Sequence, residues 1–358
     1  MNNKKLFRTI DIVLLLAVFG LSFVVDAVQP VGYLATVLRK AAVFSIVTVS
    51  MNLLNGFTGL FSLGQAGFML LGAYTYAMFS IPLGARESVY YMQEEVAGFL
   101  QVIELPIVFA IIAAGIVAAI FAYLIGLPVL RLKSDYLAIA TLGFAEIVAA
   151  FAKWQKLGPI TNAPNPLVNY PKYTKISSYF IVAGICIAII VLLVRSTYGR
   201  AFKAIRDDEV AAEAMGINLA KHKMISFVIS SFFAGVGGAM LAMFQSKAQA
   251  NSFTTALTYE ILLIVVIGGI GSISGSVFGS FLYIACSEWW LRFLDTPDVI
   301  PGLTRNGFRL VVFSAVIMII VLFFRRGIMG DKEFSTERLV KGAKKLGSRF
   351  DKKKEVEQ

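Results

Sequence analysis

Ten apolar stretches, most of them long enough to cross a lipid bilayer, are the feature of this sequence that most limits its fold. A transmembrane helix needs about 20 mostly apolar residues, and a helix satisfies its own backbone hydrogen bonds inside lipid. A mean hydropathy of +0.76 and only 15% charged residues leave too much apolar surface for one water-soluble core. We therefore predict an all-α integral membrane protein, a polytopic helical bundle of about ten spans at 9–28, 34–54, 60–79, 106–127, 136–153, 178–194, 224–244, 258–271, 275–294 and 308–324.

Basic residues predict the orientation of these spans. Lys and Arg collect in the cytoplasmic loops of membrane proteins, and here they cluster near the N-terminus, in the segment 195–223 and after residue 324. Both termini are therefore predicted in the cytoplasm, with the acidic loop 80–105 outside. The loop 154–177 disagrees, because it should be external yet holds Lys156, Lys172 and Lys175; a miscounted span before it is one explanation. The formal net charge of +11 beside apolar spans indicates membrane lipid as the partner, and no nucleic acid.

The chain divides into two predicted parts. Residues 1–330 form a transmembrane domain that includes the cytoplasmic loop 195–223, and residues 331–358 form a charged cytoplasmic tail. No G-x-x-x-x-G-K-[ST] phosphate-binding loop occurs, so we expect no ATPase site in this chain. One His and two Cys form no catalytic or metal-binding pattern. We expect no catalytic residue, metal or cofactor here, which argues against a membrane enzyme.

Two glycine-rich interruptions, at 52–76 and 266–283, predict glycine-broken or re-entrant helices in each half of the chain. Broken helices expose backbone groups that bind substrates in membrane transporters, whereas glycines also let helices pack closely, which is the commoner role of a single glycine. A carboxylate inside a span, such as Glu146, marks either a functional pathway or a hydrogen bond between helices. The same alternatives hold for Glu260, Glu288 and Arg292. The candidate residues of a polar pathway are Asn52, Ser62, Gly64, Gln65, Gly67, Thr141 and Glu146.

The segment 195–223 is the longest polar stretch between predicted spans on the cytoplasmic side. Asp207, Asp208 and Glu209 favour a helix N-terminus there, and Gly216 favours its end, which predicts a short Ala-rich helix at about 208–215. Small residues on this helix would let another protein approach closely. It is either a docking helix for a cytoplasmic motor or a solvated loop helix, and composition alone favours the second.

Three ordered runs carry a resemblance to a known family. They read SLGQAGFMLLGAY at 62–74, LRLKSDYLAIATLGFAEI at 130–147 and GRAFKAIRDDEVAAEAMGI at 199–217. Together they resemble the branched-chain amino-acid permease family, on its LivM-type branch, over about residues 40–330. One stretch departs from the family, which usually has a glycine-rich TGGPNG turn. Residues 161–166 read TNAPNP here, and this change puts the ligand in doubt.

The resemblance implies a subunit of an ATP-binding-cassette importer in the bacterial or archaeal cell (inner) membrane. Its implied partners are a sister LivH-type permease, two cytoplasmic ATPases that bind ATP and Mg, and an extracytoplasmic binding protein that delivers leucine, isoleucine or valine. The third run corresponds to the helix that contacts an ATPase. The residues carried across for that coupling role are Arg200, Arg206, Asp207, Glu209, Ala212, Met215 and Gly216.

Other readings remain open at this point. Related permeases carry urea, short amides or nucleosides, so the cargo is not fixed. More distant alternatives are an ion-coupled secondary carrier that uses Glu146 and a membrane enzyme. The first differs in its energy source, and the second needs a catalytic constellation that the sequence does not offer.

Overall fold

The computed structural model describes residues 20, 22–27, 32–93, 96–132, 134–291, 311–312, 314–315, 318, 327–330 and 333. Helices dominate these residues, and the one extended pairing within them is an isolated bridge between Leu167 and Ala248. The all-α prediction is therefore confirmed. The tail prediction lies outside the described residues apart from Glu333, as do most of the first and last predicted spans and Arg292.

The longer α-helices run in the order α2 (Tyr33–Asn52), α3 (Gln65–Ser80), α5 (Ile107–Val129), α6 (Ser134–Lys153), α8 (Ile176–Arg195), α11 (Leu219–Gln245), α12 (Thr255–Gly268) and α13 (Ile273–Ala285). Two of them continue as π-helices, α2 into η1 (Leu53–Phe57) and α13 into η6 (Cys286–Trp290). The shorter helices are α4 (Arg86–Val89), α7 (Gly158–Thr161), α9 (Thr197–Asp207) and α10 (Glu209–Ala214), with 3-10 turns at Leu83–Ala85, Gly98–Gln101, Gln155–Leu157 and Ala250–Ser252.

Six helices among the described residues are long and apolar enough to cross a membrane, or seven if the pair α3 and Leu83–Val89, bent by 101°, counts as one span. The predicted count of about ten is thus not confirmed. Two of the predicted spans, 60–79 and 275–294, do contain helices, but α3 has 16 residues and α13 has 13. These short helices follow the glycine-rich interruptions, which is where a sequence-based count of full spans is weakest.

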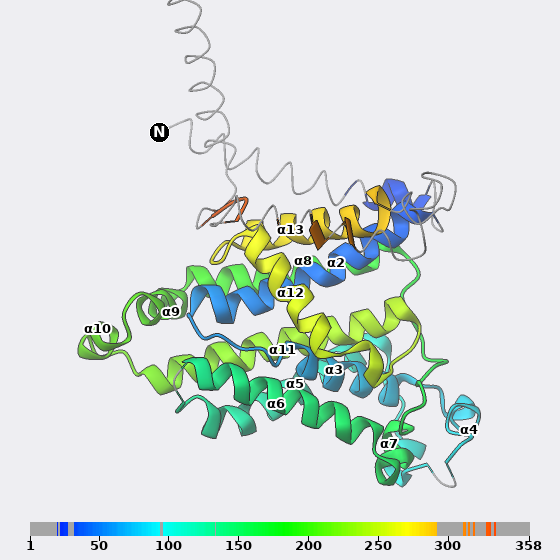
Figure 1. Ribbon diagram of the computed structural model, residues 1–358. Coiled ribbons are helices and arrows are strands. Elements are labelled where there is room, and N and C mark those ends of the chain that lie inside the picture. Colours follow the sequence, from blue (N-terminus) through cyan, green and yellow to red (C-terminus); the bar gives the residue numbers. More distant parts are fainter. Residues whose placement is uncertain are drawn as a thin grey trace, which may run out of the picture.

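The helices form two groups, as Figure 1 shows: α2, α8 and α13 lie together, and α3, α5, α6 and α11 lie together. The central element is α11, which packs against α2, α3 and α5. In Figure 1, α9 and α10 lie at one end of the bundle, hereafter the α10 end, and α4 and α7 lie at the opposite end, hereafter the α4 end.

Hydrogen bonds join the two predicted external loops at the α4 end. Ala97 donates its N–H to the carbonyl of Pro159 at 3.0 Å, and the Tyr90 hydroxyl donates to the carbonyl of Ile160 at 2.8 Å. The loops 80–105 and 154–177 therefore lie on the same side. A miscounted span between them does not explain the lysines of the second loop.

Close packing through small residues sets the distances between helices. A Cβ atom built on Gly72 of α3 would overlap the backbone carbonyl of Gly235 in α11. One built on Gly67 would lie 2.7 Å from the Cα of Ala145 in α6. Lipid offers no hydrophobic drive between helices, so such contacts supply much of the attraction.

We predict that Gly72→Ala destabilises the bundle. The added methyl group meets backbone, which cannot move aside as a side chain can, and overpacking costs about 1–3 kcal/mol. The measurement is the thermal unfolding midpoint of the detergent-purified chain, followed by circular dichroism. Gly143→Ala in α6 is the matched control, because nothing lies within 4 Å of its Cβ position. Equal midpoints for the two variants would contradict the packing argument.

Candidate functional site

The predicted short helix after residue 207 is present as α10, and the predicted signals form its ends. Asp208 is the N-cap, and its carboxylate accepts hydrogen bonds from the N–H groups of Val210 and Ala211 at 2.9 and 3.0 Å. Gly216 follows the helix with φ +84°, the left-handed conformation that glycine adopts without strain. The structure therefore confirms a capped helix at the place where the sequence predicted one.

Apolar side chains of α10 and its C-cap point away from the rest of the chain. Val210 is 78% exposed and Met215 is 84% exposed, whereas Ala212 is buried against the protein. This helix lies at the α10 end of the bundle (Figure 1). Two large exposed apolar side chains on one short helix are typical of a surface that another protein covers.

Two polar contacts tie α9 and α10 to the bundle. Arg206 donates to the carbonyl of Gly56 in η1 at 3.1 Å and also pairs with Asp207 at 2.9 Å. Glu209 pairs with Lys223 in α11 at 2.6 Å. Arg200 lines a pocket together with Phe57 of η1 and Gly271 of the turn between α12 and α13. The sequence identified Arg206 and Glu209 as candidates but did not identify their partners.

Asn52 joins the two helix breaks by hydrogen bonds. The first break lies between α2 and α3, and the second is the turn between α12 and α13. Asn52 is fully buried, and its amide donates to the Gly269 and Ser272 carbonyls at 3.2 and 2.9 Å and to the Ser276 hydroxyl at 2.7 Å. Its oxygen accepts the N–H of Gly271 at 2.8 Å. The side chain of Asn52 is thus bonded entirely within the protein, around the turn between α12 and α13.

The non-helical segment 58–64 is mostly buried, although Gly59 and Phe61 are exposed, and a side chain of another helix bonds its backbone at Leu63. The Leu63 N–H donates to the hydroxyl of Thr141 at 3.0 Å, and the Ala66 N–H, in the first turn of α3, donates to the hydroxyl of Thr258 at 3.1 Å. Such side-chain partners are what make an unwound segment tolerable at membrane depth. Thr141 lies on α6 and is fully buried.

The structure brings most of the predicted pathway residues to this break. Gln65 is buried, and its amide donates to the Ser50 hydroxyl at 2.7 Å. Ser62, three residues earlier, is also buried. Gly64 and Gly67 pack against α6. Their contacts lie within the protein, and whether a substrate reaches them stays a prediction.

Glu146 differs from the other pathway candidates because it is exposed. It accepts a hydrogen bond from the Thr255 hydroxyl and stands on an apolar face of α6 with exposed Ile139, Ile147 and Phe151. A carboxylate facing lipid is costly. This face therefore needs a protein neighbour or an aqueous route beside it.

The structure also forms an ion pair that the sequence analysis did not identify. Lys40 of α2 pairs with Glu288 of η6 at 2.5 Å, and Glu260 lies close enough to both for an electrostatic interaction. Lys40, Gln245 and Glu260 line a pocket of about 250 Å³. Local patterns could not reveal the pair, because its members lie 248 residues apart.

The departure from the family's TGGPNG turn keeps the backbone that glycines favour. Asn162 has φ 63° and Ala163 has φ 52°, both in the left-handed region, at two of the three positions where the family turn has glycine; the third position is Pro166 here. Asn tolerates this region better than other non-glycine residues. The buried Asn162 amide donates to the Val89 carbonyl at 3.1 Å, which holds the turn against the loop before α5.

Broken apolar helices in an all-helical bundle, with a capped helix standing out at one end, define a polytopic helical membrane protein. The chain belongs to the family described as the branched-chain amino acid transport system permease component, whose model matches residues 33–323.

The chain is similar to permease proteins of the LivM type and of the LivH type. The LivM high-affinity branched-chain amino acid transport permease of Escherichia coli (strain K12) is 31% identical over 73% of this chain and 64% of its own length. Probable LivM and LivH permeases of Methanocaldococcus jannaschii are 22% and 25% identical, over 71% and 63% of this chain and 80% and 73% of their own lengths. The chain thus spans less than two thirds of the length of the E. coli relative. No solved structure matches it.

We predict that Asn52→Leu lowers the free energy of unfolding by about 1–3 kcal/mol, because the Gly271 N–H loses its acceptor while buried. Chemical unfolding in mixed detergent, followed by circular dichroism, measures this change. Gln101→Leu is the control: the Gln101 amide makes a 3.0 Å hydrogen bond in an exposed loop, and its loss should cost less than about 0.5 kcal/mol. Equal losses for both variants would mean that the Asn52 hydrogen bonds do not stabilise the turn.

Proposed function

We propose that this chain is a membrane-spanning permease subunit of an ATP-binding-cassette importer, with leucine, isoleucine, valine or similar amino acids as cargo. Its family membership supports the class, and the outward-facing apolar side chains of α10 support the mechanism. ATP and Mg are bound by separate ATPase subunits, one of which covers Val210 and Met215. The chain itself supplies the route and performs no hydrolysis.

Force from the ATPase reaches the helix breaks through two described contacts. When α10 moves, the Glu209–Lys223 pair carries the movement to α11, and the hydrogen bond from Arg206 to Gly56 carries it to η1. The Asn52 hydrogen bonds then link η1 with the turn between α12 and α13. Movement of this linked set gives alternating access, which needs differential ligand binding of about a few kcal/mol between the two states.

A sister LivH-type permease is the proposed neighbour of α6. The exposed Glu146, on an otherwise apolar face, needs either protein or water beside it, and a second permease provides both along a shared route. The α10 end faces the cytoplasm together with both termini, about ten spans cross the membrane, and the α4 end receives the extracytoplasmic binding protein. The carboxylate of Glu146 would attract the ammonium group of an amino acid.

The first prediction concerns docking. Replacing Val210 and Met215 together by serine should weaken binding of the importer's ATPase subunits by at least about tenfold, because buried apolar anchors dominate such interfaces. Co-purification in detergent with quantified ATPase measures it. Met92→Ser with Val102→Ser is the matched control, because these are also an exposed Met and an exposed Val and they lie at the α4 end, with exposed fractions of 59% and 79%. Unchanged ATPase binding by V210S/M215S would remove α10 as the docking surface.

The second prediction tests cargo and route together. Proteoliposomes with this chain, the sister permease, ATPases and binding protein should show ATP-dependent, vanadate-blocked uptake of labelled leucine. Glu146→Gln should slow uptake about tenfold, the effect of losing about 1.4 kcal/mol of attraction. Glu87→Gln is its control, since Glu87 is an exposed carboxylate in the short helix α4.

The outcomes separate the alternatives. Uptake of urea, a short amide or a nucleoside in place of leucine would change the cargo and keep the class. Uptake that an uncoupler abolishes while ATP stays high would make the protein an ion-coupled carrier. Full leucine uptake by Glu146→Gln would move the route away from α6.

A further inference from the structure

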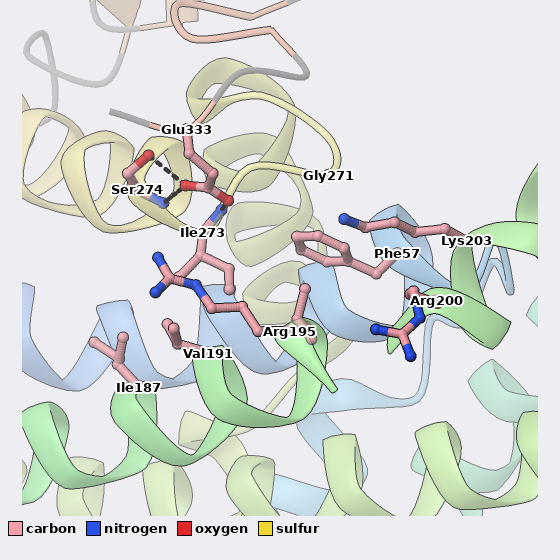
Figure 2. A pocket seen from close by; sticks show the side chains of 11 residues that line it. Phe57, Ile187, Val191, Arg195, Arg200, Lys203, Gly271, Ile273, Ser274 and Glu333 are labelled. Carbon is pink, nitrogen blue, oxygen red and sulfur yellow. Dashed lines mark hydrogen bonds between the residues drawn. The ribbon is translucent and has the colours of Figure 1, made fainter. Parts of the chain in front are cut away.

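A pocket of about 630 Å³ lies at the α10 end, where the end of α8 and the helix α9 meet the turn between α12 and α13 (Figure 2). Its walls are apolar on the side of α8, where Ile187, Val191 and Val194 line it. Since neighbouring Ile189 and Leu192 of α8 are exposed, this helix presents an apolar surface of the kind that contacts acyl chains.

Three basic side chains line the same pocket. They are Arg195 at the end of α8 and Arg200 and Lys203 of α9, and Figure 2 shows Arg195 and Lys203 on opposite sides of it. Within the described residues none of the three forms an ion pair, whereas Arg206 and Lys223 of the same polar segment do. Lys203 also lies over the ring of Phe57, with its Nζ 5.5 Å from the ring centroid. Positive-inside topology explains basic residues in this segment, but it does not explain why three basic side chains that form no ion pair with the described residues meet at one cavity.

One carboxylate, Glu333, is among the described residues that line the pocket, and it accepts hydrogen bonds from two other lining residues. Glu333 accepts the N–H groups of Ile273 and Ser274 at 2.8 and 2.9 Å and the Ser274 hydroxyl at 2.6 Å, at the N-terminus of α13. Among the described lining residues, three cations and one anion give a formal charge of +2. An anionic ligand would neutralise it.

We propose that this pocket binds one anionic phospholipid, with its phosphate between Arg195 and Lys203 and an acyl chain along Ile187 and Val191 of α8. A cationic rim directly beside an apolar wall matches a phospholipid, whose phosphate and acyl chain are joined, whereas a soluble phosphate would use the rim alone. Basic pockets between the ends of membrane helices bind anionic head groups. A lipid held between α8 and α9 would fix the position of the helix that leads into α10.

The test is native mass spectrometry of the full chain in detergent, titrated with phosphatidylglycerol. We expect one phosphatidylglycerol to bind more tightly than the rest. Arg195→Gln with Lys203→Gln should weaken that site about 30-fold, and Glu333→Gln should strengthen it about fivefold by removing the one anion. Arg131→Gln with Lys221→Gln, which removes the same charge from exposed positions outside the pocket, should leave it unchanged. Circular dichroism of each variant confirms that it is folded.

Opposite shifts for R195Q/K203Q and E333Q would support the site. Equal affinity of wild type and R195Q/K203Q would overturn it, and so would equal affinity for phosphatidylglycerol and phosphatidylcholine. Binding of inorganic phosphate with the same affinity and the same dependence on Arg195 and Lys203 would also overturn it, because the ligand would then be a soluble anion. If R195Q/K203Q does not fold, Lys203→Gln alone tests the site, and we expect it to lower the affinity for phosphatidylglycerol about fivefold.

Discussion

The close approach of α3 to α11 is the constraint on which the bundle depends. At Gly72 and Gly235 no side chain separates the two backbones, so the helices lie nearer than any larger residue would allow. Lipid tails are as apolar as the helix surfaces, so burying apolar side chains gives little drive for association and contact distance becomes decisive. Because α11 also packs against α2 and α5, a larger distance between α3 and α11 would displace helices of both groups.

Within this bundle, hydrogen bonds from neighbouring helices satisfy backbone groups at the helix breaks. The segment after η1 is unwound, yet Thr141 accepts the N–H of Leu63 within it, and Thr258 accepts the N–H of Ala66 in the first turn of α3. Asn52 does the same for the second break, and Arg206 reaches the first from α9. The breaks are therefore joined to each other and to the α10 end by hydrogen bonds. These hydrogen bonds are the contacts through which the proposed coupling would act.

The sequence predicted those features that depend on neighbouring residues. Spans followed from apolar length, and the ends of α10 followed from Asp208 and Gly216, because capping acts within one turn. It did not predict the partners of Asn52 or the Lys40–Glu288 pair, since these join residues more than 200 positions apart. The span count stayed open because glycine-rich interruptions shorten helices by amounts that hydropathy does not encode. The altered turn at 161–166 is a third case. Asn162 replaces a glycine of the family turn there and still has a positive φ.

The exposed carboxylate of Glu146 is the observation behind the proposed sister permease. Its neighbours on α6 are apolar and exposed, and its hydrogen bond to Thr255 satisfies only part of a charged group. A carboxylate that faces lipid carries a cost in free energy. The side chain would lie without that cost only beside a second protein surface or a polar route. A permease that forms half of a shared route has this property, whereas a self-contained carrier would be expected to bury the carboxylate in its own core.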